Sequence, residues 1–63
     1  MKIEIARVNR NGAKNKIQMA RELAKADAFQ RVSLADIIAT LRTYERDGLF
    51  TITDTELILY HVA

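Results

Sequence analysis

The sequence predicts a small α+β domain whose elements follow the order β-α-α-β-β and whose chain ends in a hairpin. Three observations lead to this fold class. Residues 33–47 have the apolar spacing of an amphipathic helix and are followed directly by Gly48. Two β-rich runs, residues 49–53 and 56–62, flank a short polar turn. A strand-like alternation and a second helical pattern precede them in the first thirty residues.

The first predicted strand covers residues 2–8. Ile3 and Ile5 alternate with Lys2 and Glu4, which indicates a half-buried strand with both isoleucines in the core. A turn follows at residues 9–12, because Asn and Gly tolerate the positive φ that tight turns require.

A first helix is predicted over residues 13–28. At about 100° per residue, one side of it collects the residues expected in the core, namely Ile17, Ala20, Leu23, Ala24 and Ala28. Phe29 should pack where the chain leaves this helix. Residues 30–32 form a connection short enough to hold two helices in contact.

The second helix has recognisable ends. Ser33 is a good N-cap, Asp36 is at the third helical position, where a carboxylate suits the helix dipole, and Gly48 suits the position after the C-cap. Its core side carries Leu34, Ile37, Ile38, Leu41 and Tyr44.

The last run, residues 56–62, follows a tip at Asp54 and Thr55 and does not alternate. Two leucines point to one face, and Ile58, Tyr60 and Val62 point to the other. Two helices can cover only one face of a small sheet, so we expect a homodimer with Ile58, Tyr60 and Val62 at the interface. Two alternatives stay open: a monomer whose own N-terminal residues cover the strand, and docking onto a different protein.

Composition bounds the function. The 63 residues suit one domain, residues 1–63, with no Cys and a single His. No apolar run reaches the roughly 18 residues of a membrane span, so we expect a cytoplasmic protein, with the nucleoid or nucleus as other addresses. The chain has no glycine-rich phosphate loop, no triad with a plausible pocket and no metal-ligand spacing. We therefore expect no enzyme activity, no cofactor and no metal.

Charge is distributed unevenly along the chain. The net charge is +2, but residues 1–16 hold five Lys or Arg against one Glu, a net +4, whereas residues 17–63 hold five against seven acids, a net −2. Arg10, Lys14 and Lys16 lie around the start of the first helix, where free N–H groups also favour an anion. This pattern predicts a phosphate-binding end, and the alternative is an ordinary solvated surface.

One segment carries a family resemblance. Arg21-Glu22-Leu23-Ala24, then a turn, then a helix ending in Tyr44-Glu45-Arg46-Asp47-Gly48-Leu49-Phe50, resembles a winged helix-turn-helix over about residues 17–62. The C-terminal winged-helix domains of minichromosome-maintenance helicases end in a similar way. The usual first helix of the family is missing here, and the hairpin tip, residues 53–56, has no Lys or Arg for phosphate.

The resemblance implies that residues 33–47 form a recognition helix. Its outward side carries Ala35, Asp36, Ala39, Arg42, Thr43 and Arg46. The small alanines would let the helix approach a groove, and Arg42 and Arg46 would contact base edges or phosphate.

Two functions follow from these patterns. The first is a small DNA-binding regulatory or accessory protein that binds duplex DNA, with phosphate contacts from Arg7, Arg10, Lys14 and Lys16 and groove contacts from Arg42 and Arg46. The alternative is a protein-binding module, such as a small phage-type or mobile-element protein that blocks or adapts a larger machine. The acidic hairpin and the near-neutral charge favour the alternative, and the basic N-terminal third favours DNA.

Overall fold

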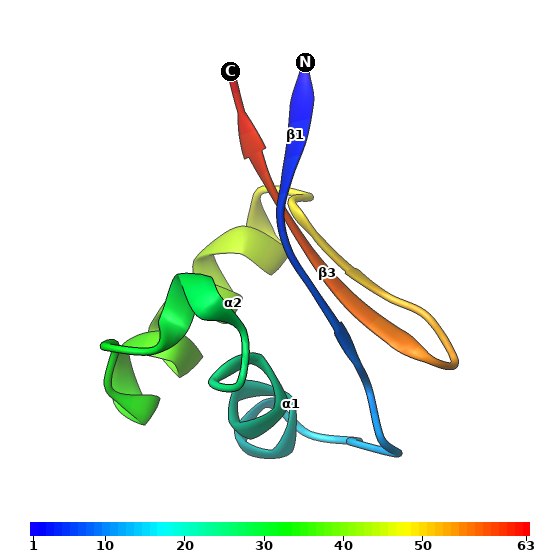
Figure 1. Cartoon of the computed structure of the whole chain (residues 1–63). Coiled ribbons are helices and arrows are strands. Elements are labelled where there is room, and N and C mark those ends of the chain that lie inside the picture. Colours follow the sequence, from blue (N-terminus) through cyan, green and yellow to red (C-terminus); the bar gives the residue numbers. More distant parts are fainter.

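A computed structural model describes all 63 residues and shows two helices packed on one face of a three-stranded antiparallel sheet (Figure 1). The elements follow the predicted order β-α-α-β-β, with an additional 3-10 turn, η1, between the helices. The bounds are β1 Lys2–Asn9, α1 Lys16–Leu23, η1 Asp27–Phe29, α2 Leu34–Arg46, β2 Phe50–Ile52 and β3 Glu56–Val62.

The last strand is the centre of the sheet, whose order is β1-β3-β2. β2 pairs with β3 only from Phe50 opposite Leu59 to Ile52 opposite Leu57, whereas β1 pairs along the whole length of β3. A β-bulge interrupts β1 at Ile5. Residues 1–5 and 60–63, the terminal ribbon, therefore project as a two-stranded arm beyond the helices, with both chain ends at its tip (Figure 1).

The first helix is shorter than the sequence pattern predicts, and the range 13–28 is wrong at both ends. Asn15 is the N-cap: its side chain accepts a hydrogen bond from the Gln18 N–H at 2.8 Å, and the Gln18 side chain in turn accepts from the Asn15 N–H at 3.4 Å. This capping box fixes the start of α1 at Lys16. The extended backbone of Ala26 (φ −76°, ψ 147°) ends the helical path before η1.

The second helix confirms its predicted ends. The Ser33 hydroxyl accepts a hydrogen bond from the Asp36 N–H at 3.2 Å, as an N-cap should. After the last turn, Gly48 adopts a φ of +73°, which L side chains rarely adopt. The run that follows begins at Phe50 and is three residues long, two shorter than predicted.

The core is one cluster formed by both helices, η1 and the helix-facing side of β1 and β3. Predicted members Leu23, Ile37 and Leu41 have no exposed surface, and Phe29 is buried as expected. The ten members are Ala6, Ala13, Met19, Ala20, Leu23, Phe29, Ile37, Leu41, Leu57 and Leu59.

Five predicted core residues are instead exposed. Ile17 is 51% exposed and Leu34 36%; Ala28, which lies in η1 and not in α1, is exposed as well, and Ile38 is only half-buried. Met19 occupies the core in place of Ile17; two residues span about 200° of helix, so both cannot face the sheet. Leu34 occupies the first position of α2, at the margin of the helix layer.

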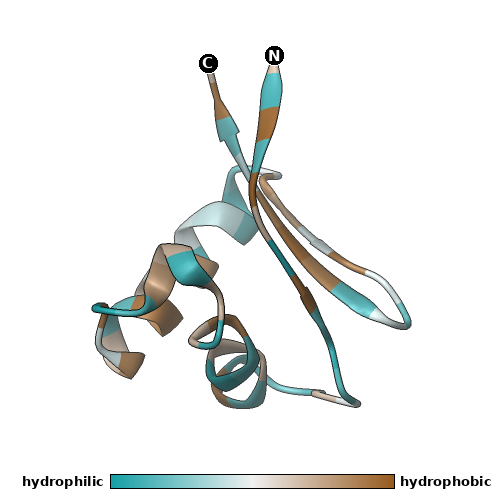
Figure 2. Ribbon diagram, in the orientation of Figure 1, coloured by the Kyte–Doolittle hydropathy of each residue, from teal (hydrophilic) through white to brown (hydrophobic).

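Ile3 and Ile5 are 46% and 40% exposed for a different reason, because they belong to the terminal ribbon, which the helices do not reach. Figure 2 shows apolar bands continuing along this ribbon toward both chain ends. The alternation in β1 is real, but no helix covers its first half.

The contrast between Leu41 and Ile17 tests this core. Leu41→Ala should lower the free energy of unfolding by about 2–5 kcal/mol, because it removes a fully buried side chain and leaves a cavity. Ile17→Ala should stay within about 0.5 kcal/mol, as at other exposed sites. Urea denaturation of both variants measures the difference, and a larger loss for Ile17→Ala would contradict the packing described here.

Candidate nucleic-acid interface

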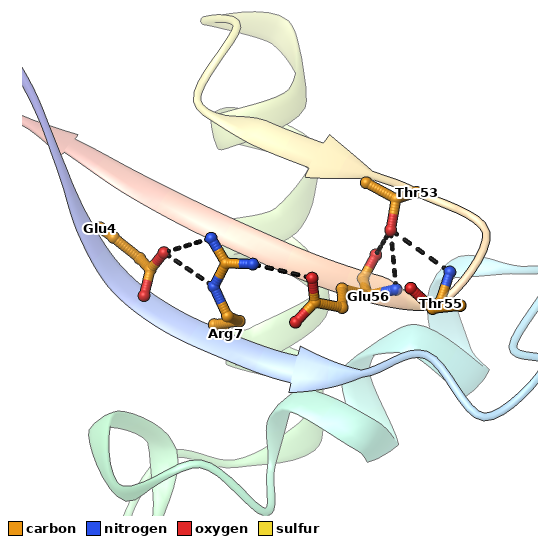
Figure 3. Close-up of polar contacts among 5 residues, drawn as sticks. All are labelled: Glu4, Arg7, Thr53, Thr55 and Glu56. Atoms are coloured by element: carbon orange, nitrogen blue, oxygen red, sulfur yellow. Dashed lines mark hydrogen bonds and ion pairs between the residues drawn. The ribbon is translucent and has the colours of Figure 1, made fainter.

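Arg7, one of the six predicted DNA-contacting cations, lies between two carboxylates on the sheet face opposite the helices (Figure 3). Its Nη1 is 2.7 Å from Glu56 Oε1, and its Nη2 is 2.8 Å from Glu4 Oε1. The hydrogen bond to Glu4 is the main cause of a raised pKa of Arg7, with Glu56 adding to it. The guanidinium charge is thus compensated within the chain.

Arg7 also covers apolar surface. It is directly opposite Ile58 in the register, and Thr51 is opposite Ile58 on the other side. Although no helix covers this face, Ile58 is only 5% exposed. We infer that these two cross-strand neighbours cover Ile58, with the aliphatic stem of Arg7 against it and the charged end between the carboxylates.

The other two residues predicted at a dimer interface differ in exposure. Lys2 Nζ is 6.0 Å from the centre of the Tyr60 ring and donates a hydrogen bond to the Gly48 carbonyl at 3.1 Å. Tyr60 is half-buried, and Val62 is 56% exposed. Within a single chain, therefore, Val62 alone of Ile58, Tyr60 and Val62 is exposed.

Arg10 is hydrogen-bonded to the tip of the hairpin. Its Nε donates to the Ala13 carbonyl at 2.6 Å, its Nη1 donates to the Thr53 carbonyl at 3.0 Å, and its backbone N–H donates to the Thr55 carbonyl at 2.8 Å. The bonds to Thr53 and Thr55 join the end of β1 to the tip between β2 and β3. The Arg10 guanidinium is consequently engaged with protein carbonyls.

The hairpin tip is organised by Thr53 (Figure 3). Its hydroxyl accepts hydrogen bonds from the Glu56 N–H at 2.8 Å and the Thr55 N–H at 3.3 Å. Asp54 at the apex is exposed and forms no ion pair. The tip therefore presents a negative charge to the solvent.

The predicted anion site at the start of α1 is not assembled. Arg10 faces the hairpin, and Lys16 Nζ pairs with Glu45 Oε2 of α2 at 2.7 Å. The side-chain oxygens of Asn15 and Gln18 accept hydrogen bonds from backbone N–H groups at this helix end. Lys14 is exposed and its ammonium has no partner within the chain.

The outward side of α2 has the accessibility expected of a contact surface. Its six residues are all exposed: Ala35, Asp36, Ala39, Arg42, Thr43 and Arg46. Arg42 has no hydrogen-bond or ion-pair partner, and Arg46, 76% exposed, meets only the neighbouring Asp47 at 3.3 Å. The Lys16–Glu45 pair places the basic start of α1 beside this arginine-bearing half of α2.

A shallow, open hollow of about 230 Å³ lies beside α1, where the sequence pattern predicts no site. Glu22 borders it and accepts hydrogen bonds from Asn11 Nδ2 at 2.6 Å and Lys25 Nζ at 3.1 Å. These contacts, with Asn11 the largest, hold the pKa of Glu22 below its ordinary value. The left-handed backbone at Asn11 and Gly12, foreseen as a turn, brings the Asn11 side chain to α1.

No cluster of three or more metal-ligating side chains is present, and no helix has the length and apolar character to cross a bilayer. Comparison with known proteins gives no matching family model, no matching curated protein and no matching solved structure. Function is therefore inferred from the surfaces described above.

Two substitutions at Arg7 test whether its aliphatic stem covers Ile58. Arg7→Met keeps an unbranched apolar stem, whereas Arg7→Ala removes it and exposes Ile58. We expect Arg7→Ala to lower the urea midpoint clearly more than Arg7→Met. Equal midpoints would mean that the ion pairs, and not the stem, account for the contribution of Arg7.

Glu22 gives a pH prediction. Because its pKa is lower in the folded chain than in the unfolded one, its contribution to stability is present above the unfolded pKa and is lost as pH falls through the folded pKa. An NMR titration of the Glu22 side-chain carboxyl carbon should show a midpoint below the ordinary value. Asn11→Ala should move that midpoint upward, and an unchanged midpoint would contradict the assigned cause.

Proposed function

We propose that this chain binds duplex DNA through the exposed side of α2 and acts as a small regulatory or accessory protein. The observation that carries the proposal is the accessibility of that side, on which Arg42 has no partner within the chain. Ala35 and Ala39 allow the helix backbone to approach a groove closely. Arg42 can then donate two parallel hydrogen bonds to a base edge or a phosphate.

The start of α1 extends this surface. Lys14 has a free ammonium, and Lys16 lies beside α2 through its bond to Glu45. Lys14 and Arg42 supply the two unpaired positive charges of this surface, and Lys16 and Arg46 lie in ion pairs with Glu45 and Asp47. Acids on the same helix, Asp36 among them, reduce the attraction for phosphate, so we expect modest affinity with a clear dependence on salt.

Arg7 and Arg10 are left out of the proposed contact set. Arg7 is held by Glu4 and Glu56, and Arg10 by two backbone carbonyls. Moving either side chain to a phosphate would break these contacts and, for Arg7, uncover Ile58. Their role in the proposal is to hold the sheet that supports α2.

Fluorescence anisotropy with a labelled mixed-sequence duplex, titrated at several salt concentrations, tests the proposal. Arg42→Gln should weaken binding by about 1–3 kcal/mol if Arg42 reads a base edge, and Lys14→Gln should reduce the salt slope by about one. Arg31→Gln is the matched control, because Arg31 is exposed and unpaired but precedes α2, at the end far from Arg42.

An equal loss for Arg31→Gln would mean that total charge, and not this surface, determines binding. The absence of any binding by the unchanged protein at low salt would reject the DNA proposal. In that case the second candidate, a protein-binding module, would take its place. The observation that favours this candidate is the acidic tip at Asp54, together with the exposed apolar residues of the terminal ribbon.

A further inference from the structure

Exposed apolar side chains gather in residues 1–5, from Met1 to the bulge of β1. Met1 is 90% exposed, Ile3 46% and Ile5 40%, and all three belong to the terminal ribbon that projects past the helices (Figures 1 and 2). Exposed apolar residues gathered on an element that its own core does not cover indicate a contact surface.

The same segment has a free backbone edge. The Met1 carbonyl accepts a hydrogen bond from the Ala63 N–H at 3.0 Å, so Met1 faces β3. By strand alternation the backbone groups of Ile3 also face β3, and the N–H and C=O groups of Lys2 and Glu4 point away from the sheet. β1 is an edge strand, with no strand beyond it to satisfy these groups.

We propose that a second copy of this chain pairs with this edge, antiparallel and centred on Ile3. Lys2 would then be opposite Glu4 of the second copy, Ile3 opposite the other Ile3, and Met1 opposite the other Ile5. The two three-stranded sheets become one continuous sheet about a two-fold axis. This inference goes beyond the DNA proposal and does not depend on it.

The charges select this register. Hydrogen bonds between the two copies form only between backbone groups that point outward from each β1 edge. Before the bulge these groups belong to Lys2 and Glu4, so Lys2 and Glu4 exchange the hydrogen bonds across the edge. Pairing Lys2 with Lys2, or Glu4 with Glu4, would place like charges directly opposite each other, which is destabilising. Only the register centred on Ile3 gives two Lys2–Glu4 pairs, one on each side of the axis.

The bulge limits the contact to residues 1–5. At Ile5 the strand gains an extra residue, and the backbone groups that face outward change from those of Lys2 and Glu4 to those of Arg7 and Asn9. A register running further would have to pair two kinked segments with each other. The regular stretch before the bulge carries the exposed Ile3, and the exposed Ile5 is at the bulge itself.

The surface differs from the one that the sequence suggested for a dimer. Ile58 is already buried in the single chain, and Val62 lies one strand away from the edge, with its side chain on the opposite face of the sheet from Ile3. The proposed contact therefore uses β1, and Val62 remains outside it.

Charge exchange tests the register. Lys2→Glu places two carboxylates opposite each other at both pairs, and Glu4→Lys places two ammonium groups opposite each other. Each variant alone should therefore dimerise about tenfold or more weakly than the unchanged chain. A mixture of the two variants restores unlike charges at every pair, and native mass spectrometry should show the mixed dimer in excess of both like dimers. Circular dichroism of each variant checks that the fold is retained.

A disulfide test uses the absence of cysteine from the chain. In the proposed register the two Ile3 side chains are directly opposite each other at a non-hydrogen-bonded position, where β-carbons are close enough for a disulfide. Ile3→Cys should therefore form a covalent dimer under mild oxidation, and Val62→Cys should form much less. Val32→Cys, at an exposed apolar site away from the sheet, measures random collision.

Several outcomes would overturn the proposal. A monomer mass for the unchanged chain in sedimentation equilibrium, from micromolar to millimolar concentration, would remove the dimer. If Val62→Cys crosslinked in preference to Ile3→Cys, the interface would lie on the sheet face opposite the helices. Crosslinking of Ile3→Cys no faster than Val32→Cys, or like dimers as abundant as mixed ones, would reject the register. All these measurements are made without DNA, so their failure is distinct from failure of the DNA proposal.

Discussion

The rest of the structure depends on how the two faces of β3 are covered, because this central strand carries apolar side chains on both. On one face Leu57 and Leu59 have no exposed surface and belong to the same cluster as Ile37 and Leu41 of α2. Burying a leucine is worth about 1.5–3 kcal/mol, so this pair anchors the helix layer. On the other face there is no helix, and we attribute the low exposure of Ile58 to its cross-strand neighbours Arg7 and Thr51. A chain of 63 residues thus covers both sides of its central strand with only one helix layer.

The contacts of Arg7 on this second face affect which positively charged side chains remain free to bind a ligand. Exposed ion pairs such as Arg7–Glu56 contribute little on their own, so we infer that Arg7 contributes to stability mainly through its stem. The pairs nevertheless fix where the guanidinium lies and remove it from the set of free cations. Arg10 is likewise fixed by the carbonyls of Ala13 and Thr53. The basic N-terminal third of the sequence is therefore largely part of the scaffold, and the free cation best placed for a ligand is Arg42 on α2.

Local signals predicted the parts of the fold that depend on neighbouring residues. The cap at Ser33, the stop at Gly48 and the bounds of β3 lie within a few residues of the groups that cause them, and the exposed side of α2 followed from helix periodicity. The ends of α1 were not predicted correctly, because the Asn15 capping box starts the helix inside an apolar pattern that continues on both sides. The partners of the cations were beyond prediction, since Arg7 and Glu56 are 49 residues apart in the chain. Periodicity could thus indicate which side of the helix is exposed, but not which charges are free.

The edge of β1 shows how one set of residues can both prevent and direct association. Charged side chains and a bulge on an edge strand oppose open-ended pairing, and Lys2, Glu4 and the Ile5 bulge do so here. Their order along the strand is self-complementary in one antiparallel register, so the same charges that disfavour other strands favour a second copy. A two-fold contact uses each edge once and therefore closes at two chains. The opposite edge of the sheet, on β2, is only three residues long and offers little for further growth.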